Sequence, residues 1–259
     1  IAGEFFNIIK VYDREGGQNM DKIKELQHLI SDSRRIVFFG GAGVSTESGI
    51  PDFRSTDGLY NQKYKYPPET ILSHTFFMRR TEEFYDFYRE KMLIEGAKPN
   101  AAHIKLAELE KAGKLTAVVT QNIDGLHQMA GSKKVYELHG SVERNYCMKC
   151  NKFYTSDAIK NSDGIPRCEC GGIIKPDVVL YEEGLDGDTI EGAVRAISEA
   201  DLLIVGGTSL VVYPAAGLID YFRGENLVLI NRGETARNKS ASLFIDGSIG
   251  ETLSRIVVD

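Results

Sequence analysis

The chain has 259 residues, of which 42% are apolar and 26% are charged, and it carries a net charge of −6. These values are typical of a soluble globular protein, and the length suits one large domain or one domain with an insert. No long basic run is present, which argues against nucleic acid and anionic membranes as main partners, and no apolar run reaches the ~18 residues of a membrane span.

Residues 1–19 lack the basic region and the small-residue cleavage site of a secretory signal. We expect this stretch to be an upstream extension or a native flexible tail. From Met20 onward Ile23, Leu26 and Ile30 fall on one helical face, which predicts a helix at the start of the folded region.

Four short apolar runs predict buried parallel strands at residues 35–40, 115–120, 202–205 and 227–230. Helical patterns separate them at residues 100–112, 189–200 and 214–222. Strands that alternate with helices form βαβ units, so the sequence predicts an α/β fold with a parallel sheet. Ligands bind beyond the carboxyl ends of such strands, and the chemistry should therefore follow Phe39, Val119, Val205 and Ile230.

Two stretches interrupt this alternation. Residues 57–98 are rich in Tyr, Phe, Glu and Arg, with helical spacing near 81–93, and residues 144–175 contain every cysteine of the chain. We expect both to be inserts that pack together as a smaller lobe. The sheet domain would then comprise residues 20–56, 99–143 and 176–259, with 57–98 and 144–175 in the smaller lobe.

A glycine-rich loop, GGAGVSTESGIPDFR at 40–54, follows the first predicted strand. Glycine there permits a tight turn and a close approach of backbone N–H groups to a pyrophosphate. The dinucleotide fingerprint G-x-G-x-x-G is not met, because Thr46 occupies its last position. A purely structural turn is the alternative interpretation.

The four cysteines form the pairs Cys147-x-x-Cys150 and Cys168-x-Cys170, separated by seventeen residues, which is close to the spacing of a zinc ribbon. Four thiolates fill a tetrahedral Zn²⁺ shell and leave no position for water, so the metal would be structural. A redox-active dithiol is the alternative.

Three further polar clusters lie at strand ends: TQNIDGLH at 120–127, ELHG at 137–140 and GGTSL at 206–210. A capped helix start would explain Asn122 or Asp124 alone, but not the whole first cluster. A lone histidine such as His139 is often structural. The third cluster fails the serine-hydrolase pattern G-x-S-x-G, and its hydroxyl groups suit phosphate or ribose contacts instead.

These motifs, together with KPDVVLYEE, GTSLVVYPAA and the later Ile230-Asn231, resemble in kind and order those of the sirtuins, the NAD-dependent protein-lysine deacylases. The resemblance covers about residues 20–259 and is strongest to bacterial single-domain members. It implies a Rossmann-type NAD-binding domain, a smaller lobe made of a zinc-ribbon module and a helical insert, and an active site in the cleft between them. It also implies an enzyme that uses NAD to deacetylate protein lysines, giving free lysine, nicotinamide and O-acetyl-ADP-ribose.

The resemblance further implies roles for individual residues. His139 would be the general base, a role that a pKa near ~6.5 suits at neutral pH, and Asn122 would be the second catalytic residue. Structural zinc would be held by Cys147, Cys150, Cys168 and Cys170. The substrate peptide would add as a strand to Val178, Val179, Leu180 and Tyr181. Contacts to NAD would come from Gly41, Ala42, Gly43, Thr46, Phe53, Arg54, Gln121, Asn122, Ile123, Asp124, His139, Thr208, Ser209, Asn231 and Asp246, with Gly247 as the alternative to Asp246.

Departures from the family pattern bear on the acyl group. Leu180 and Tyr181 stand where two phenylalanines are common, and Glu182 stands where glycine is common. Members that remove acidic acyl groups carry a Tyr-x-x-Arg pair, whereas here Arg89 follows Tyr85 by four positions. This favours acetyl-lysine as the substrate.

Three other functions are alternatives for this sequence. A mono-ADP-ribosyltransferase would need the same NAD site, so His139 does not exclude it. A non-catalytic NAD-sensing, zinc-bearing interaction module is disfavoured by the joint presence of Asn122, Asp124 and His139. An ordinary nicotinamide dehydrogenase is a weaker alternative, because it would need the third glycine. We expect a cytoplasmic enzyme whose partners are acetylated protein lysines, with the target proteins and the oligomeric state left undetermined.

Overall fold

The computed structural model describes residues 20–52, 58, 64–233, 235 and 237–258. A six-stranded sheet has the order β3-β2-β1-β7-β8-β9, and every neighbouring pair in it is parallel. Its strands are β1 (Ile36–Gly40), β2 (Leu115–Thr120), β3 (Val135–Glu137), β7 (Leu202–Gly206), β8 (Asn226–Asn231) and β9 (Leu243–Asp246). The predicted α/β fold is confirmed, and the four predicted strands are the four central ones.

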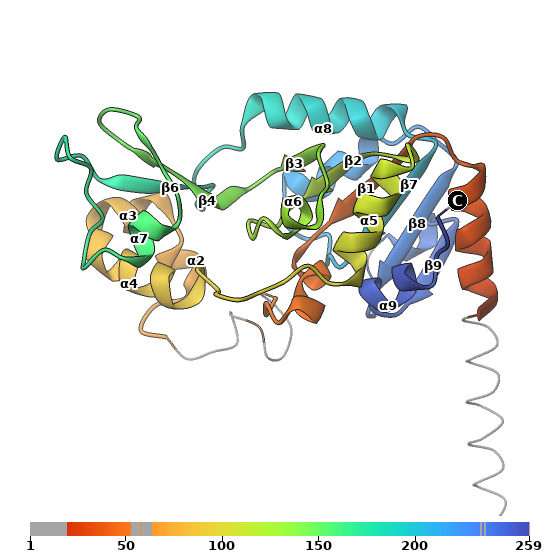
Figure 1. The fold of residues 1–259 in the computed structure, drawn as a ribbon, viewed down its shortest axis with the longest axis horizontal. Coiled ribbons are helices and arrows are strands. Elements are labelled where there is room, and N and C mark those ends of the chain that lie inside the picture. The colour runs from red at the N-terminus through yellow and green to blue at the C-terminus, as the bar shows by residue number, and fades with distance from the viewer. Residues whose placement is uncertain (1–19, 53–57, 59–63, 234, 236, 259) are drawn as a thin grey trace, which may run out of the picture.

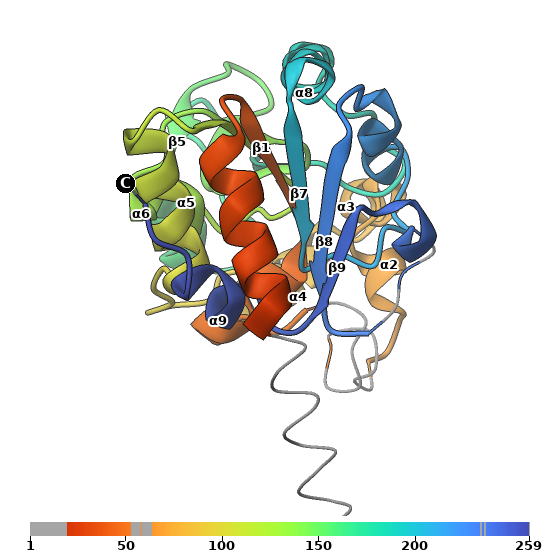
Figure 2. The ribbon, with the colours of Figure 1, turned by 90° about the vertical axis from the view of Figure 1, so that its right-hand side faces the viewer.

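The strands of this sheet are buried because their side chains alternate between two hydrophobic clusters. Ile36 and Phe38 of β1 lie in one cluster, and Val37 and Phe39 lie in the other. The first cluster is covered by the helix at residues 20–32, α5 (Ala101–Lys111) and α9 (Ile249–Ser254), and the second by α8 (Gly187–Glu199) and the 3-10 helix η4 (Ala215–Tyr221). Helices therefore occupy both faces (Figures 1 and 2), which leaves the strand ends for a ligand.

A second, antiparallel sheet lies at the opposite end of the molecule from β9 (Figure 1). Its strands are β4 (Gly140–Cys147), β5 (Phe153–Tyr154) and β6 (Ile174–Val178), and beside it lie α2 (Pro68–Ile71), α3 (His74–Arg79), α4 (Thr81–Lys91) and α7 (Asp157–Lys160). Phe84 and Tyr88 of α4 share a hydrophobic core with Val142 and Ile159. The two inserts thus pack together as predicted, while the residue limits of the division into domains stay predictions.

Some elements differ from those expected. Within the predicted helix at residues 214–222, Ala215–Tyr221 form the 3-10 helix η4 instead of an α-helix, and Gly217 in its middle lowers α-helix propensity. The shorter elements are η1 (Ala42–Val44), η2 (Thr46–Ser48), α6 (Leu126–Ala130) and η5 (Asn238–Ser240). None of the helices in the described part of the chain has the length and apolar character needed to span a bilayer.

Two buried histidines, His103 of α5 and His127 of α6, pack with their ring centroids 4.7 Å apart. His103 Nδ1 accepts the Asn100 backbone N–H, but its Nε2 and both ring nitrogens of His127 have no partner among the described residues. Burial disfavours the imidazolium form and, with a smaller effect of His103, lowers the pKa of His127 to about 3. Burial also lowers the pKa of His103.

Acid is therefore expected to destabilise the protein from pH 6.5 downward, because an unfolded histidine binds its proton near ~6.5 while the folded His127 stays neutral to about pH 3. The unfolded state gains the proton first, so the free energy of unfolding falls by about 1.4 kcal/mol per pH unit for this residue. Urea unfolding at about pH 7.5 and about pH 5 should show a smaller acid loss in His127→Leu than in wild type. His28→Leu, which removes an exposed histidine, should keep the wild-type loss; an equal loss in all three proteins would contradict this assignment.

Candidate active site

The strand order of the main sheet reverses at β1, since β2 lies on one side of it and β7 on the other. Parallel sheets bind ligands in the crevice that forms beyond the carboxyl ends at such a switch point. A cavity of about 1420 Å³ opens there. Its walls come from the segments after β1, β2, β7, β8 and β9, from the chain at the end of β6, and from residues 91–97 of the smaller lobe.

The glycine loop after β1 packs directly against the loop after β7. Gly43 N–H donates to Gly207 O over 2.8 Å. A Cβ on Gly43 would lie 2.8 Å from Gly207 Cα, so no side chain fits between the two backbones. Glycine is therefore required at this position by close packing, and the loop presents its backbone to the cavity.

Ser45, Asn122 and Asp124 form a connected set of hydrogen bonds beyond the end of β2. Asn122 Nδ2 donates to Ser45 Oγ over 3.0 Å, and Ser45 Oγ donates to Asp124 Oδ2 over 2.6 Å. The other carboxylate oxygen accepts the Leu126 N–H over 2.9 Å. Because each carboxylate oxygen has two lone pairs, Asp124 retains acceptor capacity towards the cavity that it lines.

His139 lies in the two-residue connection between β3 and β4 and lines the same cavity. Its Nδ1 is 3.0 Å from Gln121 O, and because a carbonyl can only accept, Nδ1 carries the proton of this bond. The neutral ring then has its lone pair on Nε2, which is the atom free to take a proton. Burial lowers the pKa of His139, and the bond to Gln121 partly opposes that shift, so the basic form persists below pH 6.5.

The four cysteine sulfur atoms gather within 4.8 Å of one another. Cys147 and Cys170 Sγ are 3.4 Å apart and Cys150 and Cys168 Sγ are 3.6 Å apart, near the ~3.8 Å edge of a tetrahedron with Zn–S bonds of ~2.3 Å. The Tyr154 hydroxyl donates to Cys168 Sγ over 3.1 Å, and together with the Cys170 backbone N–H it lowers the pKa of that thiol to about 6, which favours the metal-binding thiolate. The cluster is therefore consistent with a structural zinc site.

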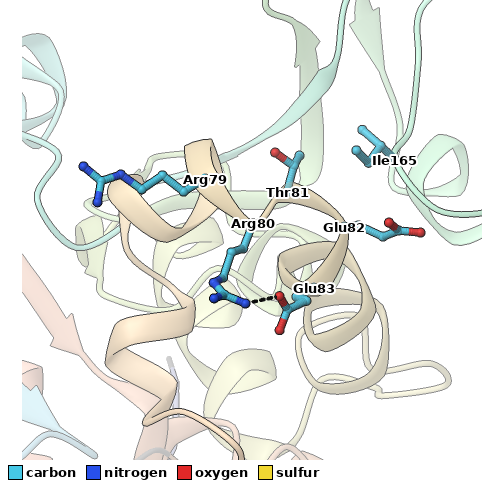
Figure 3. Close-up of a pocket in the computed structure, with 6 residues that line it drawn as sticks. All are labelled: Arg79, Arg80, Thr81, Glu82, Glu83 and Ile165. Atoms are coloured by element: carbon cyan, nitrogen blue, oxygen red, sulfur yellow. Dashed lines mark hydrogen bonds and ion pairs between the residues drawn. The ribbon is translucent and has the colours of Figure 1, made fainter.

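A second cavity, of about 740 Å³, lies at the start of α4 (Figure 3). Arg80 Nη1 donates there to Glu83 Oε1 over 2.6 Å, and both side chains are exposed, so water screens this ion pair. The cavity shares no residue with the larger one, and no residue predicted to bind NAD, zinc or peptide lines it. The larger cavity is therefore the candidate active site.

A sequence model of the Sir2 family matches residues 41–214. The chain belongs to the Sir2 family. It is 63% identical over 242 residues to the NAD-dependent protein deacetylase of Clostridium acetobutylicum, covering 92% of this chain and 99% of the relative. It is 61% identical over 241 residues to that of Clostridium perfringens, with 92% and 99% covered. A solved Sir2 with a p53 peptide and NAD+ has a TM-score of 0.80 and 45% identity, and a Sir2 bound to an acetylated peptide has 0.81 and 44%; both cover 90% of this chain and 96% of theirs.

The cavity of this Sir2 chain brings together all but one of the described residues that were predicted to bind NAD or peptide. The exception is Asp246, whose Oδ1 accepts the Gly233 N–H over 3.1 Å, while the neighbouring Gly247 lines the cavity. Gly247 therefore replaces Asp246 as the candidate. Phe53 and Arg54 lie outside the described residues. Which of the lining residues contacts NAD stays a prediction.

The predicted peptide-binding edge of the Sir2 chain needs correction at Tyr181. Tyr181 N–H donates to Leu72 O, and Tyr181 O accepts the His74 N–H, each over 2.9 Å. Val179 N–H likewise donates to His139 O over 3.0 Å. A backbone N–H already paired within the chain cannot also donate to an added strand. Tyr181 is 40% exposed and lines the cavity, so it stays a candidate contact through its side chain.

Two residues of the Sir2 motifs have positions that the motif pattern did not predict. Ser45 was not among the predicted site residues, although it joins Asn122 to Asp124 and is 1% exposed. Its only sequence signal is a hydroxyl in the glycine loop, two positions after Gly43. His127, grouped with the polar cluster by sequence, is buried and does not line the cavity.

Proposed function

We propose that this chain is an NAD-dependent protein-lysine deacetylase, which transfers the acetyl group of a modified lysine to ADP-ribose and releases nicotinamide. The observation that carries the proposal is one cavity that unites the glycine loop, the segment 121–124 and the His139 imidazole. Relatives named NAD-dependent protein deacetylase, at up to 63% identity, support it. So do the solved Sir2 structures with NAD+ and with acetylated peptide.

When bound, NAD would supply a ribose carbon that can exchange nicotinamide for the oxygen of the acyl-lysine amide. The chain's own residues would bind and orient it. Gly43 packs without a side chain, so the backbone of its loop can approach a pyrophosphate closely. Asp124 would accept the carboxamide N–H, and Asn122, fixed by Ser45, would bind the nearby ribose. His139 Nε2 would take the proton of a ribose hydroxyl.

The residues that line the cavity favour an acetyl group over an acyl group that carries a carboxylate. Tyr85 is buried and its hydroxyl donates to Ile174 O. Arg89 Nη1 donates to Gly164 O over 2.8 Å. Neither residue lines the cavity, so neither guanidinium nor phenol is positioned to bind a carboxylate on the acyl chain.

The partners of this enzyme would be proteins that carry acetyl-lysine, and its compartment would be the cytoplasm. The gathering of all four thiols into a set with zinc-like spacing supports a reducing compartment, since thiols persist there. The residues Cys147, Cys150, Cys168 and Cys170 would hold the structural zinc.

Incubation of the protein with an acetyl-lysine peptide and NAD labelled in its adenylate half tests the proposal. Deacetylated peptide, nicotinamide and labelled O-acetyl-ADP-ribose should form in equal amounts. A succinyl-lysine peptide should react about 10²-fold more slowly, because its carboxylate would enter the cavity unpaired. Label transferred to protein would instead indicate a mono-ADP-ribosyltransferase, and unchanged NAD would indicate a non-catalytic module.

A further inference from the structure

The sheet formed by β4 and β6 contains an irregularity beside the candidate active site. Ser141 of β4 pairs with Asp177 of β6, and Asn145 pairs with the adjacent Pro176, so residues 142–144 bulge out of the ladder. Bulges redirect side chains and are frequent beside active sites. This one starts three positions after His139.

Each residue of the bulge bonds to a different part of the molecule. Val142 N–H donates to Ile123 O over 2.9 Å, in the segment that follows β2. The Glu143 carboxylate accepts from Ser156 Oγ over 2.9 Å, at the start of α7. Arg144 is directed towards the connection between the two sheets.

The chain crosses between the two sheets twice, from β3 to β4 through Leu138-His139 and back after the end of β6. Arg144 binds one carboxylate beside each of these two crossings. Its Nη1 is 2.5 Å from Glu137 Oε2 at the end of β3, and its Nε is 2.8 Å from Asp177 Oδ2 near the end of β6. Glu137 immediately precedes the Leu138-His139 connection, and Val179, which follows β6, donates its N–H to His139 O. The Arg144 guanidinium therefore joins the end of β3, just before His139, to the end of β6, which bonds to the His139 carbonyl.

The two crossings are in direct backbone contact at this point. Gly140 has φ +75°, and a Cβ there would lie 1.9 Å from Asp177 O. A shift of β6 relative to β3 would therefore press on the backbone next to His139. It would also change the direction of Nε2, because the ring is held by its Nδ1 bond to Gln121 O, directly after β2 of the main sheet.

We propose that Arg144 is a positioning residue for His139, which fixes the imidazole by joining both crossings through Glu137 and Asp177. The inference rests on the proposed deacetylase function. Arg144 does not line the cavity, so it acts through His139 and not on the substrate. A misplacement of about 1 Å can lower a catalytic rate by about 10²-fold.

Arg144→Met keeps the side-chain stem and removes both ion pairs. We expect kcat for deacetylation to fall by about 10- to 100-fold, with the KM for NAD within about threefold of the wild-type value. Arg144→Lys keeps the charge but loses the planar fork, so its kcat should be intermediate. Arg195→Met is the matched control, because it breaks the exposed Arg195–Glu191 pair on α8 and should keep the wild-type kcat.

A merely structural role is separated by removing the partner carboxylate as well. The Glu137 side chain is only 7% exposed, so Arg144→Met leaves a buried unpaired charge that itself destabilises the fold. The double variant Arg144→Met/Glu137→Gln should regain thermal stability while its kcat stays low. A double variant with a kcat within about twofold of wild type would overturn the inference.

Asp177→Asn keeps the Glu137–Arg144 pair and changes a half-exposed carboxylate, so we expect it to fold even if Arg144→Met does not. It should lower kcat less than Arg144→Met does, and wild-type kcat in both Asp177→Asn and Arg144→Lys would also overturn the role of Arg144. An inactive wild type would contradict the proposed function instead, so the two failures are distinguishable.

Discussion

Replacement of His139 by alanine is expected to lower kcat for deacetylation by about 10²- to 10⁴-fold, the usual contribution of a general base. The physical reason is the lone pair on Nε2, which the bond from Nδ1 to Gln121 O leaves available in the neutral ring. Alanine removes that lone pair but changes neither the cysteine ligands nor the strands β3 and β4 on either side, so zinc content and melting temperature should stay near the wild-type values. Consumption of acetyl peptide by His139→Ala at more than about a tenth of the wild-type rate would remove His139 from this role.

The pH profile of the wild type gives a second measurement of the same role. Burial lowers the pKa of His139 below 6.5, and a base works only when it is unprotonated. The acid limb of kcat/KM, which reports the free enzyme, should therefore have its midpoint below pH 6.5. His28→Ala is the control, because this exposed histidine lies on the helix at 20–32, and it should reproduce the wild-type profile. A limb centred above pH 6.5 would contradict the assignment.

The sequence was sufficient to predict the centre of the main sheet but not its edges. The strands β1, β2, β7 and β8 are apolar runs buried on both faces, which is the pattern of a central parallel strand. The edge strand β3 has three residues and β9 has four, and β3 is only partly buried. Segments this short have no periodicity to distinguish them from loops, and their pairing depends on the neighbouring strand.

The motifs of the candidate site that follow the central strands were predictable from the sequence, but the contacts made by the inserts were not. Motifs that follow separate strands meet because parallel strands end at one edge, so their convergence on one cavity follows from the fold class. The contacts of Tyr181 with residues 72–74 and of Arg144 with Glu137 and Asp177 could not be read in this way. They depend on docking between inserts and on a bulge in strand register, which local sequence patterns do not determine.

Loss of the zinc ion is expected to lower both the stability and the deacetylase activity of the protein. Cys168→Ser, or treatment of wild type with a strong zinc chelator, should lower the melting temperature by on the order of 10 °C and abolish deacetylation. Metal analysis should give one zinc per wild-type chain and less than about a tenth of that in the variant. Met148→Ser, at a half-exposed position between two ligands, is the matched control and should keep metal and activity.

The effect should reach the active site because the cysteines hold the ends of the strands that lead to it. Cys147 ends β4, whose other end begins directly after His139. Cys168 N–H bonds to Gly172 O over 2.8 Å in the turn that leads into β6, whose other end lines the cavity at Val178. Without the metal, β4 and β6 lose their shared anchor at one end, and the crossings at the other end lose their register. Unchanged activity after complete removal of zinc would favour the redox-dithiol interpretation, which reversible loss of free thiols under mild oxidant would then support.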